Sequence, residues 1–130
     1  MIPNTNRVAM DITEPAILIR IQRAYRSGMP ADALYEVTRD VWRIGPRRFA
    51  AKYAMGVFDG IIREVYEIDG WHPAASAPYQ VRPLQDVQRP GRWEFTGRLA
   101  SENVREHYIG KSVASRWERG AANPITYVNC

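Results

Sequence analysis

The stretch YAMGVFDGIIREVYEI, residues 53–68, decides the fold of this chain. Residues 53–58 and 61–68 are rich in β-branched and aromatic side chains, which are typical of strands. Asp59-Gly60 between them is the strongest two-residue signal for a tight hairpin turn, because both positions tolerate a positive φ. The stretch therefore predicts an antiparallel β-hairpin, and we expect Gly70 to end its second strand.

The residues before the hairpin predict one strand and two helices. AILIRIQR, residues 16–23, alternates with a period of two and predicts a strand. Pro30 and Gly45-Pro46 are start and stop signals that bound a helix. Its predicted buried stripe consists of Leu34, Val37, Val41 and Ile44. A second, short helix is expected over 47–52.

The residues after the hairpin predict a long loop and then further elements. Five prolines and glycines interrupt residues 72–92, which indicates a loop. A strand is expected over 93–99, and Ser101 is a favourable N-cap for a helix over 102–109. That helix continues or restarts over 110–119, and a last strand is expected over 123–129.

The order of these elements favours an α+β fold with a strongly bent mixed β-sheet or a partly open barrel, covered by two or three packed helices. With 130 residues, 45% of them hydrophobic and 25% charged, the chain fits one globular domain over 1–130. We expect 1–15 to be a loose N-terminal arm and 72–92 a long loop.

Composition also limits the location and the chemistry of the protein. No run of about 18 apolar residues suggests a membrane span, and the first residues resemble no signal peptide. Cys130 is the single cysteine, so an internal disulfide and a cysteine-ligated zinc site are excluded. We therefore expect a cytoplasmic protein without a metal or another cofactor.

The positive charge of the chain comes almost entirely from arginine. Lysine and arginine total 18 against 14 acidic residues, giving a net charge of +4. Arginine suits bidentate phosphate contacts and stacking on bases. The candidate phosphate-binding residues are Arg39, Arg43, Arg47, Arg48 and Lys111. The alternative is that these cations belong to an ordinary solvated surface.

Two tryptophans stand at the ends of predicted elements. Trp42 lies near the end of the first helix, and Trp71 follows the second hairpin strand. Flat aromatic walls suit a flipped-out base or a methylated group, through stacking and cation–π attraction. Trp42 and Trp71 are therefore candidate base-binding residues, with burial in the core as the alternative.

The order AILIRI, ALYEVTRDVW and RRFAAKYAMGVFDGIIREVYEIDGW resembles the PUA-like superfamily, which includes the YTH, EVE and ASCH domains. The resemblance covers about residues 16–99. It implies binding of RNA or DNA, often with a modified base in an aromatic cage. Trp42 would correspond to the tryptophan after the first helix and Trp71 to the one after the hairpin.

Two other classes of function remain open from the sequence. A small nuclease or hydrolase acting on nucleic acid or nucleotides would use Glu64, Asp69, His72 and Lys111. A protein-interaction domain would use the 72–92 loop. Asp32, Glu36 and Asp40 are spaced four residues apart, which is typical of a solvated acidic helix face.

Overall fold

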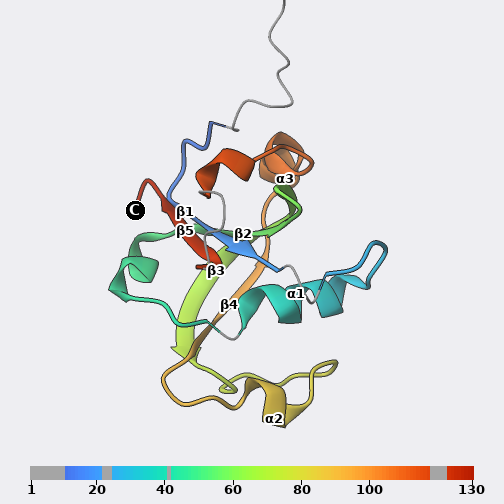
Figure 1. The fold of residues 1–130 in the computed structure, drawn as a ribbon, viewed down its shortest axis with the longest axis vertical. Helices are drawn as coiled ribbons and strands as arrows, with labels where there is room; N and C mark the ends of the chain where they lie inside the picture. The colour runs from blue at the N-terminus through green and yellow to red at the C-terminus, as the bar shows by residue number, and fades with distance from the viewer. Residues whose placement is uncertain (1–10, 22–24, 41, 118–122) are drawn as a thin grey trace, which may run out of the picture.

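The computed structural model describes residues 11–21, 25–40, 42–117 and 123–130. Its centre is an open five-stranded sheet with the strand order β4-β3-β2-β1-β5 (Figure 1). The strands are β1 (Ala16–Arg20), β2 (Tyr53–Phe58), β3 (Ile61–Pro73), β4 (Trp93–Leu99) and β5 (Ile125–Val128). The α+β class and the mixed sheet are confirmed.

One pair of strands is parallel and needs a crossover. β1 runs parallel to β2, whereas the other neighbouring strands are antiparallel. A parallel pair cannot be joined by a tight turn. The crossover contains α1 (Ala31–Arg39) and the 3₁₀ helix η2 (Pro46–Ala50), which confirms the short helix expected over 47–52.

The hairpin is confirmed, but its second strand is longer than predicted. Asp59 and Gly60 have φ values of 54° and 74°, as the turn requires. β3 continues past Gly70 to Pro73 because β4 pairs with it to that point. A register shift between Ile68 and Gly70 leaves Asp69 unpaired as an irregularity in the ladder, and Gly70 itself pairs with Thr96.

The first helix is shorter than predicted. α1 ends at Arg39, and Asp40 has extended backbone angles. Two backbone hydrogen bonds join Trp42 to Trp93, with N–O distances of 3.0 and 2.9 Å. This pairing with β4 is incompatible with a continued helix. Of the predicted stripe, Leu34 and Val37 do pack against the core, whereas Val41 lies outside the described residues.

Each face of the sheet has its own hydrophobic core. Ile17 and Ile19 of β1 point to one face, which carries Phe95 and is covered by α1 and η2. Leu18 points to the other face, which is covered by α3 (Glu102–Tyr108). Ser101 caps α3 as predicted. β1 is therefore buried on both sides and fixes the centre of the fold.

The remaining segments differ in part from the predictions. Residues 11–15 are not loose, because Ile12 is buried and the Lys52 N–H donates to the Pro15 carbonyl at 2.8 Å; residues 1–10 lie outside the described part. The long loop is confirmed over 74–92 and contains the short helix α2 (Leu84–Val87). Between 110 and 117 the structure has the 3₁₀ turn η3 (Ala114–Arg116). In the described part of the chain, every helix is too short or too polar to cross a membrane.

Candidate functional site

The backbone bridge between Trp42 and Trp93 has arginines on one side and acidic residues on the other. Because the bridge is antiparallel, Arg43 after Trp42 lies across from Arg92 before Trp93. On the other side of the bridge, Asp40 is close enough to Glu94 for the charge of Glu94 to raise its pKa. The two arginines are exposed or half-buried, whereas Asp40 and Glu94 are 1% and 0% exposed. The cationic pair therefore faces solvent and the acidic pair faces the interior.

A cation–aromatic column stands beside the cationic pair. The Arg48 guanidinium carbon lies 4.0 Å from the centre of the Trp93 ring and 4.3 Å from that of Phe49. Arg48 is buried between them and donates to the Ile44 carbonyl at 3.3 Å. The Phe49 ring at the end of the column is 67% exposed. The Phe49 ring is thus fixed on one side by the buried Arg48 and is exposed to solvent, so that another flat group can stack on it.

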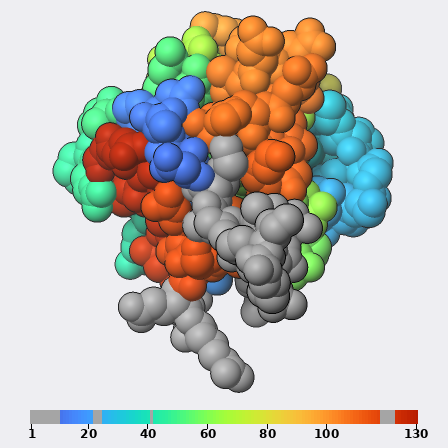
Figure 2. Space-filling view, turned by 90° about the horizontal axis from the view of Figure 1, so that it is seen from above, coloured from blue at the N-terminus to red at the C-terminus, as the bar shows by residue number. Residues whose placement is uncertain are grey.

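The other arginine of η2, Arg47, points toward β5 and away from Trp93. Arg47 lies 4.3 Å over the Tyr127 ring of β5 and donates to the Cys130 carbonyl. Figure 2 shows the η2 segment next to the C-terminal strand on one flank of the molecule. We call this region the η2 surface, which consists of the exposed Arg43, Arg47 and Phe49, the half-buried Arg92 and the buried Arg48.

The η2 surface is positive because its two chain segments contain no acid. Residues 41–58 and 87–93 have no aspartate or glutamate. The ion pairs found among the described residues involve neither Arg43 nor Arg92. Arg43 and Arg92 therefore place two cations on neighbouring segments without an acidic ion-pair partner among the described residues, and such a position attracts an anion.

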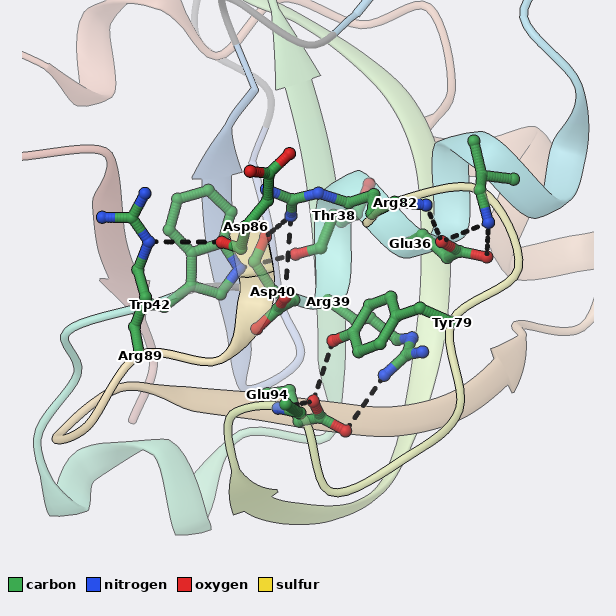
Figure 3. Close-up of polar contacts among 12 residues, drawn as sticks. Glu36, Thr38, Arg39, Asp40, Trp42, Tyr79, Arg82, Asp86, Arg89 and Glu94 are labelled. Atoms are coloured by element: carbon green, nitrogen blue, oxygen red, sulfur yellow. Dashed lines mark hydrogen bonds and ion pairs between the residues drawn. The ribbon is translucent and has the colours of Figure 1, made fainter. Parts of the chain in front are cut away.

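Behind the bridge, two buried carboxylates hold the long loop (Figure 3). Glu94 accepts hydrogen bonds from the Ala75 and Ala77 N–H groups, the Tyr79 hydroxyl and Arg39, at 2.7 to 3.0 Å. Glu36 accepts from the N–H groups of 80–82 at 2.9 to 3.1 Å. Burial opposes the charge of Glu36, but these N–H groups lower its pKa below the ordinary value.

The third buried carboxyl, Asp40, is different. Neither of its oxygens has a hydrogen-bond partner in the described part of the chain. Its nearest cation is Arg82, with an N–O distance of 3.6 Å. Burial, reinforced by the neighbouring charge of Glu94, raises the pKa of Asp40 to about 6. Its protonation state therefore changes close to neutral pH.

The predicted acidic helix face is wrong for two of its three members. Asp32 is exposed, but Glu36 and Asp40 are buried. The physical reason is that the loop after β3 folds over the end of α1 and supplies N–H donors. The sequence alone does not indicate that Tyr79, Arg82 and Glu94 belong to this site. They meet α1 only in the folded chain, through contacts between residues some forty or more positions apart.

Trp42 and Trp71 belong to one aromatic cluster, with β4 running between their backbones. Trp42 pairs with Trp93, and Trp71 lies opposite Phe95, which it meets edge-on at 5.5 Å. The Trp42 indole donates to the Thr38 carbonyl at 2.7 Å. Both indoles are half-buried against the core. A base could enter between them only if side chains of β4 moved.

Of the five predicted phosphate-binding residues, Arg43 and Arg47 are exposed on the η2 surface. Arg48 belongs to the same region, but it is 6% exposed and lies between the Trp93 and Phe49 rings. Arg39 is 3% exposed and bonded to Glu94 at 3.0 Å, so its guanidinium is not accessible to a phosphate. Lys111 lies at the far end of β3, where its carbonyl accepts from the Ile62 N–H at 3.0 Å.

The candidate catalytic residues are not gathered in one place. Glu64 pairs with Arg105 at 2.8 Å, and Asp69 pairs with Arg98. His72 bonds to Thr96 at 2.9 Å, near the end of β3 opposite Lys111. At about 3.3 Å per residue, the strand between Ile62, which contacts Lys111, and His72 is roughly 33 Å long. No cluster suited to holding a metal ion occurs in the described part of the chain.

One cavity of about 230 Å³ lies between the start of α1 and the β3–β4 edge. Tyr35, Tyr66 and Leu99 contribute to its lining, whereas neither Trp42 nor Trp71 does. The cavity thus contains none of the predicted base-binding, phosphate-binding or catalytic residues.

No protein-family model, curated protein or solved structure matches this chain. The resemblance to the PUA-like superfamily stays a prediction based on the order of elements and on Trp42 and Trp71. Support for a function comes from the geometry and charge of the described residues.

Proposed function

We propose that this protein binds nucleic acid through the η2 surface. The observation that carries the proposal is the position of Arg43 across from Arg92, beside the Trp93–Arg48–Phe49 column. A phosphate between the two arginines would offset their repulsion and accept charge-assisted hydrogen bonds from both. Phosphate groups along a nucleic-acid backbone supply such anions repeatedly.

The aromatic column favours a strand with unpaired bases. Phe49 is exposed and lies next to cations, which is the combination that sequence-tolerant single-strand binders use. A base stacked on Phe49 would extend the column by one flat layer. Its flanking phosphates would then lie within reach of Arg47 on one side and of the Arg43–Arg92 pair on the other.

The residue on which a base stacks is then Phe49 and not Trp42 or Trp71. Trp42 fixes the bridge that aligns Arg43 with Arg92, and Trp71 packs on Phe95. A base held between Trp42 and Trp71 would require side chains of β4 to be displaced. Stacking on Phe49 requires no rearrangement of the core.

Titration of a fluorescently labelled single-stranded oligonucleotide, followed by anisotropy, tests the proposal. We expect the Arg43→Ala/Arg92→Ala double variant to bind more weakly than the unchanged protein. Lys111→Ala removes a positive charge at the far end of β3 and is the matched control, which we expect to bind normally. Equal affinity of the double variant and the unchanged protein would overturn the proposal.

A further inference from the structure

We propose that binding at the η2 surface is linked to protonation of Asp40, so that nucleic acid binds more tightly when this carboxyl is neutral. The inference rests on the proposed function and adds its regulation. It follows from the charge balance of the buried cluster behind the Trp42–Trp93 bridge and from the short path between that cluster and the cationic pair.

The buried cluster contains one more carboxyl group than guanidinium groups. Around Asp40 lie Arg39 of α1, Tyr79 and Arg82 of the loop, and Glu94 of β4, and Glu36 of α1 joins the same cluster through Arg39 (Figure 3). With every group in its ordinary state, three carboxylates oppose two guanidinium groups, which leaves one net negative charge. One bound proton makes the cluster neutral, and buried charge is costly unless it is balanced.

The hydrogen bonds determine which carboxyl holds the proton. Glu36 accepts three backbone N–H groups, and Glu94 accepts two together with Tyr79 and Arg39. These donors satisfy the oxygens of both carboxylates, and those on Glu36 lower its pKa. Asp40 accepts no hydrogen bond from a described residue. It also follows the last residue of α1, where the negative end of the helix dipole opposes a carboxylate.

Burial outweighs the groups that favour an ionised Asp40. The Tyr79 hydroxyl, which donates to Glu94 at 2.8 Å, also lies close to Asp40, and together with the charge of Arg82 it lowers the pKa of that carboxyl. Burial is the larger effect and, with the charge of Glu94, raises the pKa of Asp40 to about 6, which places the change near neutral pH.

The bridge connects this proton to the binding surface. Asp40 and Arg43 lie on either side of Trp42, and Glu94 and Arg92 lie on either side of Trp93. A phosphate at the arginine pair is thus separated from Asp40 by a few residues of partly buried protein. Like charges at such a separation repel, so a bound phosphate favours protonation of Asp40. By thermodynamic linkage, protonation strengthens phosphate binding by the same factor.

The test is the affinity of the labelled oligonucleotide at pH values below and above the pKa of Asp40, for the unchanged protein and for Asp40→Asn. Asparagine has the shape of the protonated acid and cannot ionise. We expect the affinity of the unchanged protein to fall about fivefold as Asp40 ionises, since solvent and salt weaken the repulsion between the carboxylate and the phosphate without abolishing it. Asp40→Asn should keep the tighter affinity throughout.

Histidine protonation could also strengthen binding at low pH, so His72→Gln is the control. It should leave the pH dependence in place. Proton uptake on binding, measured by calorimetry in buffers with different ionisation enthalpies, gives a second readout on the unchanged protein. An unaltered pH dependence in Asp40→Asn, or no proton uptake near the pKa of Asp40, would overturn the linkage. The proposed function would still stand if the protein bound the oligonucleotide in a salt-dependent manner. Absence of binding at every pH would overturn both the linkage and the proposed function.

Discussion

Asp40→Asn should make the protein more stable at neutral pH, although it removes a buried ionic group. The pKa of Asp40 rises from 3.8 to about 6 on folding. A pKa difference of about two units corresponds to about 3 kcal/mol, at about 1.4 kcal/mol per unit. This is the free energy that the folded protein loses by holding an ionised carboxyl at this position.

The direction of the pH dependence follows from the raised pKa. The folded state binds the Asp40 proton more tightly than the unfolded state does. The stabilisation from this proton is fully present below pH 3.8 and is lost as the pH rises through about 6. Relative to Asp40→Asn, the free energy of unfolding of the unchanged protein should therefore fall over this interval and then level off.

Urea unfolding of both proteins at a series of pH values measures this difference. Comparing the two curves cancels the other acids, including Glu14 and Glu36, whose lowered pKa values contribute in the opposite direction. The two proteins should be equally stable at acid pH, and the variant should be more stable by about 3 kcal/mol above neutrality. A variant that is less stable at neutral pH, or a difference that does not change with pH, would refute the reasoning.

Two further substitutions probe the cluster and the surface separately. Glu94→Gln leaves the buried Arg39 without its ion-pair partner and should lower the free energy of unfolding by about 3–5 kcal/mol. Its matched control is Glu67→Gln in the exposed pair with Arg98, which should cost less than about 1 kcal/mol; similar losses in urea melts would contradict the assignment. Phe49→Ala should leave the melting curve nearly unchanged but weaken single-strand binding roughly tenfold, whereas Phe49→Trp should preserve binding. Unchanged affinity in Phe49→Ala would exclude stacking on this ring.

The parts of the fold that sequence predicted well are those with local signals. The Asp59-Gly60 turn, the strand over 93–99 and the Ser101 cap each depend on residues that are close in the chain. The end of α1 was predicted poorly, because the helical periodicity continues to Ile44. What stops the helix is the backbone pairing of Trp42 with Trp93, about fifty residues away.

In the candidate site, too, the features with local sequence signals could be predicted and those that depend on tertiary contacts could not. The arginines near Pro46 could be recognised from their spacing and charge, and Arg43 and Arg47 are exposed in the same region, whereas the burial of Arg48 could not be foreseen. The burial of Glu36 and Asp40 could not be predicted, since their spacing also fits a solvated helix face. Their environment depends on N–H groups of a loop that carries no periodic pattern. Phe49 was overlooked because its exposure follows from tertiary packing.

The salt dependence of oligonucleotide binding tests the central claim most directly. The slope of log Kd against log salt concentration should be measured for the unchanged protein, Arg43→Ala/Arg92→Ala and Lys111→Ala. If the arginine pair holds phosphates, the double variant should lose about 0.7 of slope for each single-strand phosphate contact removed, and Lys111→Ala should keep the original slope. Equal slopes for all three proteins would contradict nucleic-acid binding at the η2 surface.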